Sequence, residues 1–394
     1  MIIGCISDTH EISREVIREI VEEEFKKRKV EVVVHAGDII PAHVDPELFG
    51  GLPVVCVLTK DQAFSPHFAV SPQNWRFVRP AYAQDPPKSA GKFNDPAAAA
   101  KISELEEFCE LQRIFARLVR IGDLVAYCGH ERSFDAFNRP EKVKDFFTQV
   151  NQVKDGVYLA ITGHSHHQFL YRTNNVTWVN PGAVERSWNS TVEFAVIDTT
   201  RNQVIFARLS KAEAKATPVT IGIVSDTAEV SDLDANYWAR LAKQFQDRGV
   251  TEVICCGYFQ PQDIGRPELS DMQVYYYLMP EDKGKNEEHR PANWHPIDHD
   301  KPIVEICSHR FYVQHGIGPE QANFSEIQRD NAFKELFHQH QRLDFIVAGL
   351  TSDTIYQEAQ NYAFIDPGDA RDHKCVCTVC LPRRELDFFI LPNE

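Results

Sequence analysis

Carboxylates and imidazoles recur at four turns in the first half of the sequence. These turns contain Asp8 with His10, Asp38, His130, and His164 with His166. Oxygen and imidazole ligands together suit Mn²⁺, Fe, Co or Zn. Glycines next to several of them allow tight turns at the carboxyl ends of strands, where α/β sheets place their ligands. The pattern predicts a site for a divalent transition metal.

The elements that must position these side chains are short apolar strands. Each turn follows an apolar segment typical of a buried strand, and amphipathic segments at 13–28 and 234–248 predict helices. Strands alternate with helices at first and give way to hairpin-like strands over residues 170–210. This order predicts an α/β sandwich with the sheets in the middle and the helices outside.

The sequence also contains an internal similarity that predicts two tandem domains. Residues 1–13 read MIIGCISDTHEIS and residues 219–231 read VTIGIVSDTAEVS, while VTWVNPGA at 176–183 matches YAFIDPGD at 362–369. We expect a first domain over 1–210, a linker over 211–218 and a second domain over 219–394. The two should fold alike and pack through a pseudo-symmetric or side-by-side interface.

The first copy is longer than the second because of extra residues in its middle. A segment rich in Pro, Ala and Gln, at about 62–97, is expected to be a loop or small cap, and a helix is expected over roughly 98–120. Long insertions of this kind are often lids.

Composition narrows the class of protein. The net charge of −15 disfavours broad nucleic-acid binding, while a small phosphorylated substrate remains compatible if metal cations dominate the local field. The first residues lack the layout of a signal peptide and no apolar run is long enough for a membrane span, so we expect a cytoplasmic protein. The cysteine-rich segment 375–380 is read as a buried strand, with a metal knuckle as the alternative.

The motifs resemble those of the calcineurin-like metallophosphoesterase superfamily, in its small bacterial and archaeal phosphodiesterase branch. The resemblance covers nearly all of residues 1–210 and implies a two-metal site in the N-terminal domain, with Mn as the first candidate and Fe, Zn, Ni or Co as alternatives. It implies that the first metal is held by Asp8, His10, Asp38 and His166. Asp38 would bridge to a second metal held also by His164, an Asn and another His, and the metals would activate a water for attack on phosphorus.

Two positions depart from the family pattern. Thr59 and Lys60 stand where the family has Gly-Asn, and Cys128 stands where it has a ligand His, two residues before His130. Either a Cys128 thiolate and Asp61 complete the second site, or Cys128 packs and Lys60 faces solvent. We expect His130 and Lys60 to act in catalysis, Lys60 as a fixed positive charge that repels a second cation. Asn180 is expected to orient the neighbouring loop, with substrate contact as the alternative.

The second copy has lost most of these groups. Asp226 remains, but Ala228, Tyr258, Leu350 and Ser352 replace the other expected ligands, and His315 has no partner ligands. We therefore expect no catalytic metal there, and a structural or partner-binding role. The leading function is a phosphodiesterase or phosphatase acting on a small substrate; the rival is a catalytically impaired scaffold that binds proteins.

Overall fold

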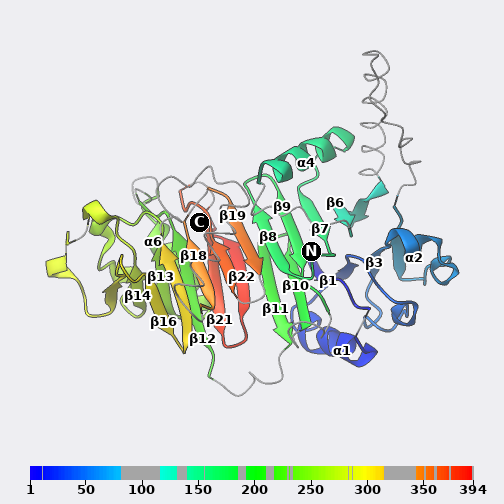
Figure 1. Ribbon diagram of the computed structural model, residues 1–394, viewed down its shortest axis with the longest axis horizontal. Coiled ribbons are helices and arrows are strands. Elements are labelled where there is room, and N and C mark those ends of the chain that lie inside the picture. The colour runs from blue at the N-terminus through cyan, green and yellow to red at the C-terminus, as the bar shows by residue number, and fades with distance from the viewer. Residues whose placement is uncertain are drawn as a thin grey trace, which may run out of the picture. The chain divides into compact units, whose positions relative to one another are not determined.

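The structure is a computed structural model. It describes residues 1–394 except 11, 81–115, 131–139, 155, 185–191, 210–216, 229, 231–233, 283, 286, 315–342, 350–351, 359–361, 372–373 and 393–394. By their contacts the residues form two compact units, Met1–His166 with Asn175–Glu185, and His167–Asn174 with Arg186–Glu394. The fold is mixed α/β, with strands of two sheets in each unit and few helices (Figure 1), which confirms the predicted class.

In the first unit, one set of strands is wholly parallel. Each strand pairs with the next along the chain, and the two central strands are buried along their whole length, as near-continuous apolar runs in parallel sheets require. These strands are β1 (Ile2–Ile6), β2 (Val32–His35), β3 (Val54–Val57) and β4 (Trp75–Val78). The connecting helices are α1 (Arg14–Glu19), which continues as a π-helical turn over Ile20–Phe25, and α2 (Lys60–Phe64).

The other sheet of this unit supplies the remaining ligand turns. A hairpin leads into a strand that pairs in parallel with β7, and β7 pairs in parallel with β9. The strands are β5 (Leu118–Ile121), β6 (Leu124–Gly129), β7 (Leu159–Thr162) and β9 (Thr177–Pro181), and helix α4 spans Pro140–Val153.

Two sequence predictions about the middle of this unit are wrong in part. Residues 75–78 lie in the predicted loop or cap but form β4, since Trp75 and Val78 are buried against β3. The predicted helix ends too late, because Leu118–Ile121 forms β5 and pairs antiparallel with β6. The rest of the predicted cap (81–97) and residues 98–115 of the helix lie outside the described residues.

The second unit contains three strands from the first half of the sequence and all those of the second half. The three are β8 (Gln168–Arg172), β10 (Val192–Asp198) and β11 (Gln203–Leu209). The others are β12 (Val219–Ser225), β13 (Val250–Cys256), β14 (Gln273–Tyr276), β15 (Trp294–Pro296), β16 (Ile303–Ile306), β17 (His309–Gln314), β18 (Phe345–Ala348), β19 (Thr354–Glu358), β20 (Ala363–Asp366), β21 (Cys375–Leu381) and β22 (Glu385–Ile390). Helix α6 (Tyr237–Asp247) packs its aromatic face into the core.

The two halves of the chain share the same order of strand pairings. The parallel series β1 to β4 has its counterpart in β12 to β15, and the series β5, β6, β7, β9 in β16, β17, β18, β20. Gly182 and Gly368, at the matched Pro-Gly turns, have φ of 81° and 85°. This correspondence favours the tandem duplication that the sequence predicts.

Counterpart strands of the two halves also pair with each other. β11 pairs antiparallel with β22, and β8 pairs antiparallel with β19. All four of these strands belong to the second compact unit. Because these strands pair across the two halves of the sequence, the boundary between the two compact units does not fall at the predicted linker, 211–218. Most of that linker lies outside the described residues. The predicted domain boundaries stay a prediction.

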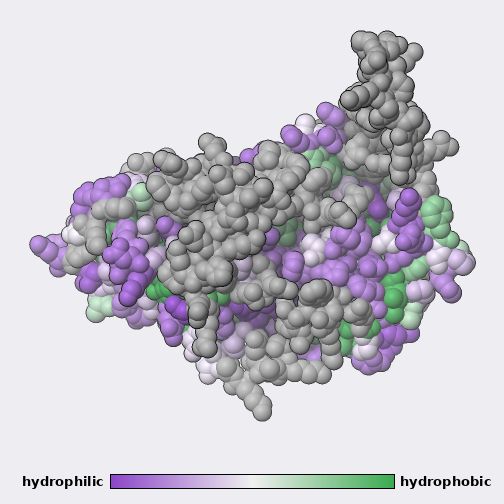
Figure 2. All heavy atoms as spheres, in the orientation of Figure 1, coloured by the Kyte–Doolittle hydropathy of each residue, from purple (hydrophilic) through white to green (hydrophobic). Residues whose placement is uncertain are grey.

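On the face shown in Figure 2, hydrophilic residues cover most of the coloured surface, and hydrophobic ones occur between them. Among the described residues, none of the helices has the length and apolar character that crossing a bilayer takes.

A buried ion cluster connects strands of both halves within the second unit. Arg208 of β11 lies 3.2 Å from Glu193 of β10 and 2.7 Å from Glu358 of β19, and all three side chains are less than a tenth exposed. Burial raises the pKa of Glu193 to about 8 even though the guanidinium of Arg208 lowers it. Arg208 is therefore the nearest positive charge to both buried carboxyl groups, and Arg384 also lies 3.8 Å from Glu358.

We predict that Arg208→Met lowers the free energy of unfolding by about 3–5 kcal/mol, because it removes the nearest positive charge from two buried acids. Arg201→Met is the matched control, since Arg201 is 79% exposed beside Asp198, and should change stability by less than ~0.5 kcal/mol. Urea denaturation of both variants measures the difference. Equal free energies of unfolding for Arg208→Met and Arg201→Met would show that the ion cluster does not stabilise the pairing of these strands.

Candidate metal centre

Five predicted site residues lie directly after strands of the first unit. Asp8 follows β1, Asp38 follows β2, His130 follows β6, and His164 and His166 follow β7. Four of them have left-handed backbone conformations, with φ of 54° at Asp8, 55° at Asp38, 78° at His164 and 59° at His166. Non-glycine residues rarely adopt this region, and such residues cluster at functional sites.

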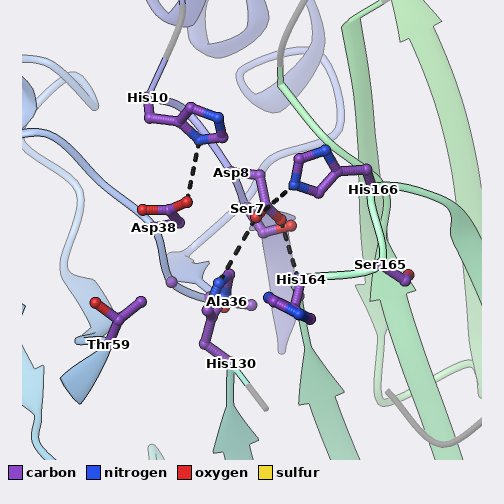
Figure 3. A network of polar contacts seen from close by, with 12 residues as sticks. Ser7, Asp8, His10, Ala36, Asp38, Thr59, His130, His164, Ser165 and His166 are labelled. Atoms are coloured by element: carbon purple, nitrogen blue, oxygen red, sulfur yellow. Dashed lines mark hydrogen bonds and ion pairs between the residues drawn. The ribbon is translucent and has the colours of Figure 1, made fainter. Parts of the chain in front are cut away.

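The side chains converge on one place. His166 Nε2 lies 3.3 Å from Asp8 Oδ1, His130 Nε2 lies 3.7 Å from the same oxygen, and His10 Nδ1 lies 3.2 Å from Asp38 Oδ2. Ligand atoms of Asp8, Asp38 and His130 lie within 4.8 Å of one another. Figure 3 shows these side chains pointing toward one another from separate strand ends.

Asp8 is the most deeply buried member. Burial acts to raise the pKa of its carboxyl, but the neighbouring imidazoles of His166 and His130 outweigh it, and the pKa lies below its ordinary value. Asp8 Oδ2 accepts a hydrogen bond from the His164 N–H at 3.1 Å. Asp8 Oδ1 is buried and accepts no hydrogen bond of normal geometry among the described residues. An ionised oxygen in this position, surrounded by carboxylate and imidazole ligands, fits a divalent cation.

The orientation of His130 is set by the backbone. Its Nδ1 lies 2.8 Å from the Ala36 carbonyl oxygen, and because a carbonyl only accepts, Nδ1 carries the proton. In the neutral ring the lone pair is then on Nε2, which faces Asp8, as in metal-ligating histidines. The ring of His164 packs edge-on against His130 at 5.2 Å. Thus the residue expected to act in catalysis lies among the possible ligands.

A buried hydrogen-bonded chain below the site was not foreseen from the sequence. Gly37 N–H donates to His35 Nδ1 at 3.3 Å, so His35 Nε2 carries the proton and donates to Thr9 Oγ1 at 3.0 Å; the Thr9 hydroxyl then donates to His43 Nδ1 at 3.3 Å. Burial lowers the pKa of His35 to about 3, so its ring is neutral. The chain anchors the turn between Asp8 and His10, and an isolated His in an apolar strand gives no signal of this role.

Gln62 is a second residue that sequence reasoning missed. It follows the N-cap Thr59 of α2 in a capping box, and its side-chain amide donates to Asp38 Oδ1 at 3.3 Å. The spacing Thr-x-x-Gln is a recognised helix-start signature, so the motif was visible in the sequence. Its contact with the metal turn was not.

The sequence matches no protein-family model, and no curated protein is similar to it at the threshold applied. Solved structures do resemble it. An archaeal phosphodiesterase is 20% identical, with 53% of this chain and 100% of that chain covered, at a TM-score of 0.30. A predicted phosphoesterase of Streptococcus pneumoniae is 16% identical, with coverage of 54% and 90% and a TM-score of 0.30.

A third similar structure is Vps29 of Entamoeba histolytica in complex with Zn²⁺, at 11% identity, with 53% of this chain and 91% of that chain covered and a TM-score of 0.31. Each of these likenesses extends over about half of this chain, at identities of 11–20%.

The positions that depart from the metallophosphoesterase pattern have plain structural surroundings. Cys128 is fully buried in β6, and burial raises the pKa of its thiol to about 12, which favours the packing interpretation. Lys60 and Asp61 are exposed in the first turn of α2, and neither forms an ion pair with a described residue. Asn180 is buried, and its amide donates to the Gly163 carbonyl at 3.1 Å and to Ser165 Oγ at 2.9 Å. It therefore orients the turn that carries His164.

In the second half, Asp226 stands at the position that matches Asp8, and its carboxylate has different partners. Asp226 keeps the left-handed backbone of Asp8, with φ of 51°. One of its oxygens accepts from the Ser225 hydroxyl and the other from the Tyr258 N–H at 2.9 Å. Among the described residues of this half, we find no group of potential ligands like that around Asp8. Ala228 is buried and Ser352 is exposed, and the predicted positions His315 and Leu350 lie outside the described residues.

Gly37 makes room for His130. A Cβ at Gly37 would lie 2.3 Å from Cγ of His130, whereas a Cβ at Gly51 would meet nothing, and both glycines have positive φ, 107° and 74°. We predict that Gly37→Ala lowers metal affinity by ~10-fold or more, as the loss of ligand orientation does elsewhere. Gly51→Ala should have only the backbone cost of about 1 kcal/mol.

Titration of both variants with Mn²⁺, together with thermal unfolding, separates the two effects. Equal metal affinities in Gly37→Ala and Gly51→Ala would contradict a role for His130 at the metal.

Proposed function

We propose that the first half of the chain is a metal-dependent phosphoesterase, acting as a phosphodiesterase on a small phosphorylated substrate. The observation that carries the proposal is the convergence of Asp8, Asp38 and His130, with His10 and His166 in contact with the two carboxylates. These groups come from separate strand ends and serve no evident packing purpose. Burying such polar groups is unfavourable unless they find partners.

Asp8, His10, Asp38 and His166 would hold the cation, and His130 is a further possible ligand. When bound, a divalent metal lowers the pKa of a coordinated water and withdraws charge from phosphoryl oxygens. The protein's own contribution is orientation: the Ala36 carbonyl fixes the proton of His130 on Nδ1, and the Thr9 chain holds the turn between the first two ligands. Oxygen and imidazole ligands suit Mn²⁺, Fe, Zn, Ni or Co, and the resemblance of the motifs makes Mn²⁺ the first candidate.

The substrate class follows from charge. With a net charge of −15, the protein repels long polyanions, so nucleic acid is disfavoured. A small phosphoester meets the metal's local positive charge instead.

The rival proposal is that the protein is a scaffold that binds a protein partner. The structure of the second half supports this alternative. There Asp226 is satisfied by hydrogen-bond donors of the chain itself, so this half keeps the fold without the metal chemistry. In the two-part proposal the first half is the enzyme and the second half is a structural or partner-binding module.

We predict that Asp38→Ala abolishes stoichiometric metal binding, measured per chain by inductively coupled plasma mass spectrometry. Hydrolysis of bis(4-nitrophenyl) phosphate should fall by at least ~10²-fold, because no neighbouring group replaces a metal-binding carboxylate. Asp226→Asn is the matched control in the second half and should change neither quantity.

Metal binding without hydrolysis by the wild-type protein would favour the scaffold. Loss of metal in Asp226→Asn would show that the second half holds the catalytic cation, contrary to the proposal.

A further inference from the structure

All polar functions of the Gln62 side chain are engaged by the chain itself. Its Nε2 group donates to Asp38 Oδ1 at 3.3 Å and to the Ile39 carbonyl at 2.9 Å, and its Oε1 accepts from the Thr59 N–H at 3.0 Å. A primary amide has two N–H donors and one oxygen. Both donors and the oxygen are therefore in use.

These contacts leave the two oxygens of Asp38 in different surroundings. Oδ2 faces His10 at 3.2 Å, on the side of Asp8 and His166, while Oδ1 accepts from one amide N–H of Gln62. A carboxylate that bridges two cations offers one oxygen to each. Here the second oxygen meets a group with positive partial charge and no lone pair, which repels a cation and cannot ligate it.

The amide oxygen of Gln62 is turned away for a reason internal to the helix. It belongs to the capping box in which Thr59 and Gln62 satisfy each other's backbone N–H groups at the start of α2. Rotating the amide to present its oxygen to a cation would break this reciprocal pair. The two residues that could have completed a second metal site do not replace this amide oxygen, since the Cys128 thiol is fully buried and Asp61 is exposed.

We propose that Gln62 makes this a one-cation site: its amide occupies Oδ1 of Asp38 and withholds its own oxygen, so that Asp38 binds a single metal through Oδ2. The inference rests on the proposed function, because it assumes that the first cation binds. It assigns the restriction to Gln62 and not to the positive charge of Lys60, which is exposed one residue after the N-cap.

The test is the number of Mn²⁺ ions per chain at saturation, measured by equilibrium dialysis and mass spectrometry, with the electron paramagnetic resonance spectrum of the bound ions. The wild-type protein should bind about one Mn²⁺ and give the six-line signal of an isolated ion. Gln62→Glu keeps a capping-box side chain and adds an anionic oxygen beside Asp38, so it should bind about two ions and show the multiline spectrum of a coupled pair. Lys60→Ala, in the same helical turn, is the matched control and should stay at about one.

Two Mn²⁺ ions in the wild-type protein would overturn the inference, as would a rise to two in Lys60→Ala. A Gln62→Glu protein that is folded by circular dichroism but stays at one ion would also overturn it; should that variant not fold, Gln62→Leu, which frees Asp38 Oδ1, must change the coordination of the bound ion in the spectrum. No metal in the wild-type protein would refute the proposed function itself. One ion without phosphodiester hydrolysis would refute the enzyme but support the role of Gln62.

Discussion

The carboxylate of Asp8 is shielded from water where β1, β2 and β7 end, and an ionised group in such a place needs positive charge or hydrogen-bond donors. The His164 N–H satisfies one oxygen, and the other faces His130 and His166. Asp226 has the same requirement in the second half and meets it with the Ser225 hydroxyl and the Tyr258 N–H. One fold thus gives a buried carboxylate two different partners, and only the first leaves an oxygen for a cation.

The backbone around this carboxylate constrains the rest of the centre. Left-handed conformations at Asp8, Asp38, His164 and His166 place side chains from separate strands in one space. Gly37 and Gly163 lie where a Cβ would collide with His130 or with the Ala36 carbonyl. The hydrogen bonds of Asn180 fix the turn that carries His164, and those of Thr9 fix the turn between Asp8 and His10. The candidate ligands are therefore held in place by residues outside the predicted ligand set.

Much of this arrangement could be predicted from the sequence. Residue types that can bind a metal stand at the ends of apolar runs, and the succession of strands and helices along the chain follows from local patterns. The role of Gln62 could not, although its capping box was visible, because contact with Asp38 depends on how β2 and α2 meet in space. Lys60 is exposed in the first turn of α2, and its catalytic role stays a prediction. Strand partners such as β8 and β19 are also distant in sequence, so no local pattern shows that β8, β10 and β11 join the second unit.

The central claim is that the buried aspartate of the first half binds a cation while its counterpart in the second half is satisfied by the protein. Anomalous scattering from crystals grown with Mn²⁺ tests it most directly, since it locates each ion. The account predicts one anomalous peak per chain, in contact with Asp8, Asp38, His10 and His166, and none beside Asp226. A peak beside Asp226, or none beside Asp8 in crystals of a protein saturated with Mn²⁺, would contradict it.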